Sequence, residues 1–202
     1  MTKPSQTMTP FFKFVSSVFL SRDITLPLQS FNFICEKASS LHQHDINRFL
    51  QAAVQRGIEN LNLEMSNAAF EFKLPPTVFS CKTLVVIHLK ALLVHDLSQV
   101  VVDFPLLKAL HLSSVTFAYD EYLLKLLSGC PILEELEIDW IDASNVDESL
   151  VLAENFQCLP NLIRANIHLS LCSANVLFPL LCRAKILCVD LVRILYDSPI
   201  NV

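Results

Sequence analysis

The stretch that decides the fold is residues 81–138, which read CKTLVVIHLKALLVHDLSQVVVDFPLLKALHLSSVTFAYDEYLLKLLSGCPILEELEI. Three times in this stretch, apolar residues stand at positions 1, 4 and 6 of a short segment: Leu84, Ile87 and Leu89, then Leu107, Leu110 and Leu112, then Leu133, Leu136 and Ile138. We name these the anchor positions. The last two anchors alternate with one outward residue, as a β-strand requires, and the first turns the chain inward from a corner. Because one such unit cannot bury its apolar side alone, it must stack on copies of itself.

Weaker copies of this spacing lie on both sides of the central stretch. They are Leu28, Phe31 and Phe33; Ile58, Leu61 and Leu63; Leu162, Ala165 and Ile167; and a less regular last copy, Ala184, Leu187 and Val189. The intervals between first anchors are 30, 26, 23, 26, 29 and 22 residues, close to the roughly 20–29 residues of leucine-rich repeats. The pattern predicts an α/β fold. We expect a curved leucine-rich-repeat solenoid, with a single parallel sheet of about five to seven strands on the concave side and helices or irregular returns on the convex side.

A single domain is expected over residues 11–202, because each repeat of a solenoid contacts only its neighbours. Residues 1–10 are polar, which predicts a disordered N-terminus. The sequence from residue 173 onward fits the repeat least well and is expected to form an atypical tail.

Helices are predicted where apolar residues recur at helical spacing between the strands. These segments are residues 11–20, 45–56 and 120–127, with a further short helix possible within 144–154. Asp45 is expected to cap the second helix and Gly57 to end it. The segment Pro76–Lys82 should form a turn or a 3₁₀ piece, because Leu74-Pro75-Pro76 blocks a longer helix.

Composition excludes several classes of function. The 202 residues are 52% hydrophobic and 17% charged, which supplies a long continuous core. The net charge is −5 and the 15 Lys and Arg residues are scattered singly, which argues against a nucleic-acid surface. The 2 glycines leave no Gly-rich phosphate loop. No apolar stretch reaches the roughly 18 residues that a membrane helix needs, so no membrane partner is expected.

The seven cysteines lie at positions 35, 81, 130, 158, 172, 182 and 188. None forms the C-x-x-C pair typical of zinc sites, and an odd number with irregular spacing does not fit a disulfide framework. Cys81 and Cys130 each lie three residues before a first anchor, which predicts a small buried side chain at the corner. We therefore expect structural, reduced cysteines in a reducing compartment, cytoplasmic or nuclear.

A search for catalytic sets predicts that the chain is not an enzyme. His42 and His44 lack further metal ligands beyond Asp45 and are interpreted as solvated residues at a helix start. The carboxylates of Glu134–Asp139 are interpreted as a solvated acidic row. The chain has no nucleophile elbow, Walker loop or dinucleotide fingerprint. No catalytic, cofactor-binding or metal-ligating residue is therefore predicted, and no cofactor.

The residues between the last two anchors are candidates for binding a partner. They must point away from the core if the anchors point inward. They are Asn32, Asn62, His88, His111, Glu137 and Asn166, flanked by Glu135 and Asp139. His88 and His111 should lie about 5 Å apart if their strands are adjacent. We expect an unknown protein partner on the concave sheet face, with a basic segment opposite Glu135, Glu137 and Asp139.

Several strings carry a family resemblance. They are FFKFVSSVFLSRD at 11–23, RFLQAAVQRGIENLNL at 48–63, LPPTVFSCKTLVVIHL at 74–89, FPLLKALHL at 104–112 and LLSGCPILEEL at 126–136. Together they resemble the leucine-rich-repeat region of plant F-box/LRR proteins that carry an FBD segment. The resemblance covers roughly residues 11–169.

The resemblance implies the substrate-recognition repeats of a cullin-type ubiquitin ligase subunit. In such receptors the F-box holds a Skp-type adaptor and the repeats hold the protein to be ubiquitinated. The F-box pattern of Leu-Pro and Trp-Arg pairs is not found in this sequence, where the one Trp is Trp140. We therefore expect adaptor binding only if an F-box is supplied elsewhere. The alternative is a stand-alone or truncated repeat protein that binds a partner passively or has no function.

Overall fold

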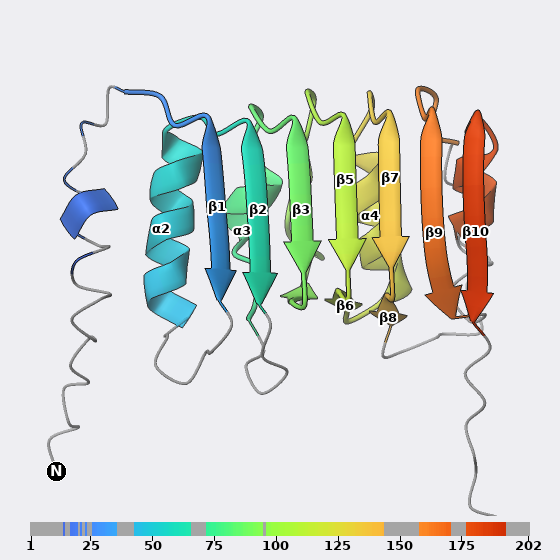
Figure 1. Cartoon of the computed structure of the whole chain (residues 1–202), viewed down its shortest axis with the longest axis horizontal. Helices are drawn as coiled ribbons and strands as arrows, with labels where there is room; N and C mark the ends of the chain where they lie inside the picture. The colour runs from blue at the N-terminus through green and yellow to red at the C-terminus, as the bar shows by residue number, and fades with distance from the viewer. Residues whose placement is uncertain are drawn as a thin grey trace, which may run out of the picture.

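The structure is a computed structural model that describes residues 14, 17–19, 21, 23, 26–35, 43–65, 72–94, 96–143, 158–170 and 177–192. Within these residues, seven parallel strands form one sheet, in the order β1-β2-β3-β5-β7-β9-β10 (Figure 1). Their bounds are β1 Ser30–Cys35, β2 Asn60–Met65, β3 Val86–Lys90, β5 Ala109–Ser113, β7 Glu135–Asp139, β9 Arg164–Ser170 and β10 Ile186–Val192. Each predicted repeat supplies one strand, including the irregular last copy. The predicted α/β fold with a parallel sheet is confirmed.

The anchors form the core, and the strands pair so that equivalent anchors lie side by side. Four equivalent anchors on neighbouring strands are in register, and all are buried: Leu61, Ile87, Leu110 and Leu136. Leu187, the equivalent residue of the last strand β10, is 51% exposed, whereas Phe31 of the first strand β1 is 8% exposed and packs against Phe19. Burial of an edge anchor therefore depends on a segment that covers it.

In the view of Figure 1, the helices of the described residues lie behind the strands, except for the first, which lies beside the edge strand β1. They are α2 Gln43–Gln55, α3 Pro76–Phe79, α4 Asp120–Ser128 and the 3₁₀ helix η3 Phe178–Leu181. The predicted helices at 45–56 and 120–127 are confirmed. The predicted turn at Pro76–Lys82 contains one α-helical turn. Of the predicted helix at 11–20, the described residues Phe14 and 17–19 are helical.

Asp45 is not the cap that the sequence predicted. Helix α2 already includes Gln43, so Asp45 lies inside its first turn, where it is buried. The helix begins earlier because Gln43 has its own partners: its side chain donates to Lys73 O at 2.6 Å and accepts from Lys73 N at 2.9 Å. Gly57 ends the helix as predicted, with φ of 68°, a value that glycine adopts without strain.

A second parallel sheet was not predicted, since the sequence indicated a single one. Its two-residue strands are β4 Leu93–Val94, β6 Thr116–Phe117 and β8 Asp142–Ala143, in the order β4-β6-β8. One residue after β3, β5 and β7 the backbone takes positive φ, at Ala91 (54°), Ser114 (52°) and Trp140 (53°). This left-handed residue bends the chain out of the large sheet and into the small one. Nothing marks it in the sequence, because glycine is absent at all three positions.

The expectation that all cysteines are reduced is wrong for one pair. Cys158 and Cys182 form a disulfide across 24 residues. That separation is about one repeat, so the two cysteines fall on neighbouring turns of the array, close in space although irregular in sequence. The prediction of buried thiols is confirmed for Cys81 and Cys130.

Other sequence-based expectations are only partly tested. The predicted disordered residues 1–10 and the possible helix within 144–154 lie outside the described residues. The domain bounds and the curvature of a solenoid stay predictions. No described helix is long and apolar enough to cross a membrane.

Candidate functional site

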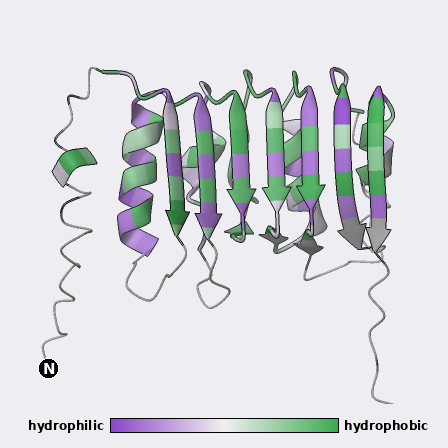
Figure 2. Cartoon of the chain, viewed as in Figure 1, coloured by the Kyte–Doolittle hydropathy of each residue, from purple (hydrophilic) through white to green (hydrophobic). Residues whose placement is uncertain are grey.

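The candidate site is the face of the seven-stranded sheet that none of the described helices covers, which we name the open face. The predicted outward residues meet there in register from β1 to β9, as Asn32, Asn62, His88, His111, Glu137 and Asn166. We name this row the polar ladder. Figure 2 shows the corresponding hydrophilic bands crossing the strands between hydrophobic ones. The sequence therefore predicted the placement of these six residues correctly, and their role in binding stays a prediction.

Three neighbouring pairs of the polar ladder are in side-chain contact. Asn62 Nδ2 donates to Asn32 Oδ1 at 2.9 Å. The rings of His88 and His111 stack, with centroids 4.1 Å apart and planes 11° from parallel. His111 Nδ1 lies 2.8 Å from Glu137 Oε2. These contacts hold the side chains in fixed orientations before any partner binds, which lowers the entropy lost on binding.

The acidic row is paired, which revises the interpretation of these carboxylates as simply solvated. Besides the contact of Glu137 with His111, Glu135 lies 3.9 Å from Arg164 and Asp139 lies 3.8 Å from His168. Each acid therefore faces a basic side chain on the neighbouring strand. A partner's basic segment would compete with these groups, and two of the three are histidines, whose charge depends on pH.

His88 is the group of the open face whose titration the surroundings change most clearly. Burial lowers the pKa of His88 from its ordinary value, and the neighbouring His111 lowers it further. The carboxylates of Glu137 and Glu135 act in the opposite direction and only partly offset this. The result favours a neutral His88, which can both donate and accept a hydrogen bond.

A second ladder runs beside the first and was missed by sequence reasoning. Its members are Glu64, Lys90, Ser113, Asp139 and His168, in register from β2 to β9. Lys90 Nζ donates to Glu64 Oε1 at 2.6 Å, and Ser113 Oγ donates to Asp139 Oδ2 at 3.2 Å. The signal is present in the sequence, because outward residues continue every second position along a strand. All five residues directly follow the last anchor of their repeat, outside the interval between the last two anchors on which the prediction rested, and only Asp139 was named there, as a flanking residue.

Between the two ladders lies a shallow groove of about 460 Å³. Its polar lining comes from both ladders and includes Asn62, His88, Lys90, His111, Glu137 and Asp139. At the far end, Asn166 is half-buried, and its Oδ1 atom has no hydrogen-bond partner among the described residues. The ladder ends on β10 at the exposed Cys188.

The arrangement offers hydrogen-bonding groups and charges. Among the described residues, no group of three or more His, Cys, Asp or Glu side chains could hold a metal ion. The open face is thus suited to non-covalent recognition, with donors and acceptors spaced by the strands.

Comparison with known proteins points to one family. Residues 46–159 match the family model for the leucine-rich repeats of FBD-associated F-box protein At5g56370. The putative FBD-associated F-box protein At5g56560 of Arabidopsis thaliana is 35% identical over 140 residues, which is 67% of this chain and 31% of that protein. The F-box/FBD/LRR-repeat protein At1g78750 of the same plant is 41% identical over 95 residues, which is 46% of this chain and 20% of that protein.

These matches cover about a third or less of the relatives' own length. No solved structure matches the chain.

Proposed function

This chain belongs to the family of FBD-associated F-box proteins, whose leucine-rich repeats it carries, and we propose on that premise that it recognises a protein through its open face. The observation that carries the proposal is the polar ladder, an ordered row of side chains on the open face of the sheet. A row of this kind matches an extended or irregular protein surface better than a small ligand, because it is long and shallow.

We further propose that the open face is the concave side of a solenoid. The segments that contain α2 and α4 take more space than the short loops between the strands. They would hold neighbouring repeats further apart on the helical side of the sheet than on the open face, and so curve the array. The helices α2 and α4 occupy that side, with 13 and 9 residues. A concave face presents several repeats to one partner at once, which is how repeat proteins gain binding area.

The role in ubiquitin ligation is the finer part of the proposal. Relatives carry "F-box" in their names, and the sequence resemblance implies substrate recognition for a cullin-type ligase. We propose that the repeats hold the substrate without catalysis, while an F-box supplied elsewhere would hold a Skp-type adaptor. A cytoplasmic or nuclear setting stays part of the proposal, and the disulfide between Cys158 and Cys182 argues against it, because disulfides are rare in those compartments.

The binding test compares proteins captured from a plant extract by the wild-type chain and by the variant H111A/E137Q. Glu121→Gln is the control, since Glu121 is exposed on α4 behind the sheet. We expect the open-face variant to lose proteins that the wild type and the control retain. If all three chains capture the same proteins, the open face is not the binding surface.

The adaptor test is separate. We expect purified residues 1–202 not to form a complex with a Skp-type adaptor in gel filtration. A stoichiometric complex would mean that the repeats themselves carry an adaptor site, and would assign the chain directly to the ligase.

A further inference from the structure

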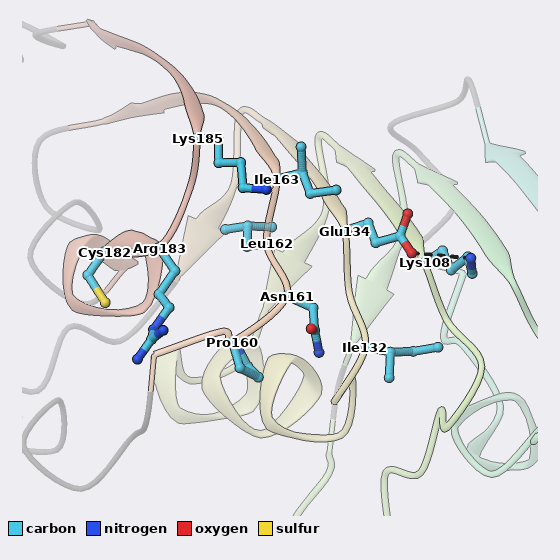
Figure 3. A pocket seen from close by; sticks show the side chains of 10 residues that line it. All are labelled: Lys108, Ile132, Glu134, Pro160, Asn161, Leu162, Ile163, Cys182, Arg183 and Lys185. Carbon is cyan, nitrogen blue, oxygen red and sulfur yellow. Dashed lines mark ion pairs between the residues drawn. The ribbon is translucent and has the colours of Figure 1, made fainter.

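A second surface lies where the last strands begin, at the corners that lead into β5, β7, β9 and β10. It is a groove of about 820 Å³, which we name the corner groove. The residues that carry the argument are Lys108, Ile132, Glu134, Ile163, Arg183 and Lys185, and Figure 3 shows them around the recess. It shares no lining residue with the groove between the ladders.

The backbone of the corner groove is a continuous extension of the sheet. Glu134 N donates to Lys108 O at 2.9 Å, Ile163 N to Glu134 O at 2.8 Å, and Lys185 N to Ile163 O at 2.9 Å. The side chains of Lys108, Glu134, Ile163 and Lys185 are therefore held about one strand spacing apart. The disulfide between Cys158 and Cys182 fixes the turn that carries Arg183 against the preceding repeat. The groove is thus a rigid surface.

The charge of the corner groove is opposite to that of the chain. Its lining holds three cations, Lys108, Arg183 and Lys185, and one carboxylate, Glu134, a balance of 3 − 1 = +2, whereas the whole chain carries −5. Lys108 Nζ pairs with Glu134 Oε1 at 3.2 Å. In the described part of the chain, no carboxylate pairs with Arg183 or Lys185. Both are exposed, so their charge is available to a ligand.

An apolar side chain lies between the charged groups of the groove. Ile163, which lines it, is 40% exposed. In Figure 3, Ile163 stands between Lys185 and the pair formed by Lys108 and Glu134. An apolar centre with a cationic rim is the usual composition of a surface that binds an acidic peptide with an apolar anchor.

We propose that the corner groove binds an acidic segment of a partner protein. One apolar side chain of that segment packs on Ile163, and its carboxylates pair with Arg183 and Lys185. A peptide is favoured over an anionic membrane because the carboxylate of Glu134 lies among the cations and would face the lipid headgroups. This site is independent of the open face.

The test uses a random twelve-residue peptide library displayed on phage. The library is selected against the wild-type chain and, in parallel, against R183E/K185E. We expect wild-type selection to enrich peptides rich in Asp or Glu around an aliphatic or aromatic residue. Binding of these peptides should weaken about tenfold or more in R183E/K185E, as for loss of paired charges at an interface.

Two control variants distinguish the loss of specific charges from a loss of folding. R48E/K73E reverses two exposed cations elsewhere and should leave peptide binding unchanged. Ile163→Ser should weaken binding without changing the preference for acidic residues. The melting temperature of each variant is compared with that of the wild type, and one that unfolds is replaced by its milder form, R183Q/K185Q or Ile163→Ala.

Three outcomes would overturn the proposal. The first is enrichment of peptides without acidic residues. The second is equal enrichment of the same acidic peptides on the wild type and on R183E/K185E. The third is binding to phosphatidylserine vesicles that depends on Arg183 and Lys185, which would assign the groove to a membrane surface. Since H111A/E137Q alters only the open face, it should bind the selected peptides normally, so this test succeeds or fails separately from the proposed function.

Discussion

The Nδ1 atom of His111 lies 2.8 Å from the Oε2 atom of Glu137, across the boundary between β5 and β7. The His111 ring also stacks on that of His88 of β3. Three repeats are therefore linked on the open face by one imidazole. The contact between His111 and Glu137 can form in both protonation states of the ring. A charged imidazolium donates from Nδ1 to the carboxylate, and so does a neutral ring whose proton is on Nδ1.

The pKa of His88 should shift in opposite directions when its two neighbours, His111 and Glu137, are replaced. His111→Asn removes a repelling imidazolium and should raise the pKa of His88, whereas Glu137→Gln removes a stabilising carboxylate and should lower it. Proton NMR titration of the His88 ring measures both shifts. Shifts of the same sign would contradict the arrangement of the three side chains.

The lowered pKa of His88 also makes the free energy of unfolding depend on pH. The pKa of His88 in the folded chain lies below 6.5, so the unfolded chain binds the proton more tightly. Its contribution to stability is present above pH 6.5 and is lost as the pH falls toward the folded pKa. Urea unfolding between about pH 5 and pH 7 should show this loss, and His88→Gln should reduce it.

Leu110→Ala should lower the free energy of unfolding by roughly 2–5 kcal/mol, as for a buried leucine that leaves a cavity. Leu110 is fully buried in the centre of the sheet. Leu106→Ala is the matched control, because Leu106 is 50% exposed and should cost less than about 1 kcal/mol. Urea denaturation measures both, and equal effects would mean that Leu110 is not part of the core.

Removing the disulfide with C158S/C182S should destabilise the last repeats by about 3 kcal/mol, as expected for a closed loop of this length. The loss should be local, because each repeat depends on its neighbours. Hydrogen exchange should therefore accelerate in β9 and β10 and stay unchanged in β2 and β3. Uniform acceleration across the sheet would show that the array unfolds as one unit.

The thiols should differ sharply in reactivity. Burial raises the pKa of Cys130 to about 12, and its Sγ donates to Leu126 O at 3.2 Å, so the reactive thiolate is scarce at about pH 8. Cys188 is exposed on the last strand. Iodoacetamide at about pH 8, followed by peptide mass spectrometry, should modify Cys188 within minutes and leave Cys130 unmodified in the folded chain. Rapid labelling of Cys130 without denaturant would contradict its buried position.

Sequence alone determined the strand array and the polar ladder. The anchors repeat at a near-constant interval, and side chains alternate faces in a strand. Together these two regularities place each outward residue beside its equivalent in the next repeat. The spacing of the anchors is therefore sufficient to align Asn62, His88, His111 and Glu137.

Only the tertiary structure decided what these residues contact. The second sheet depends on left-handed residues such as Ala91 and Trp140, which carry no sequence signal. The pairing of Cys158 with Cys182 and the opposing bases at Glu135 and Asp139 join residues of neighbouring repeats. Such contacts depend on side-chain directions across two or more turns of the array. The periodic spacing of the anchors determines the distance between successive repeats. The packing between repeats determines which side chains come into contact.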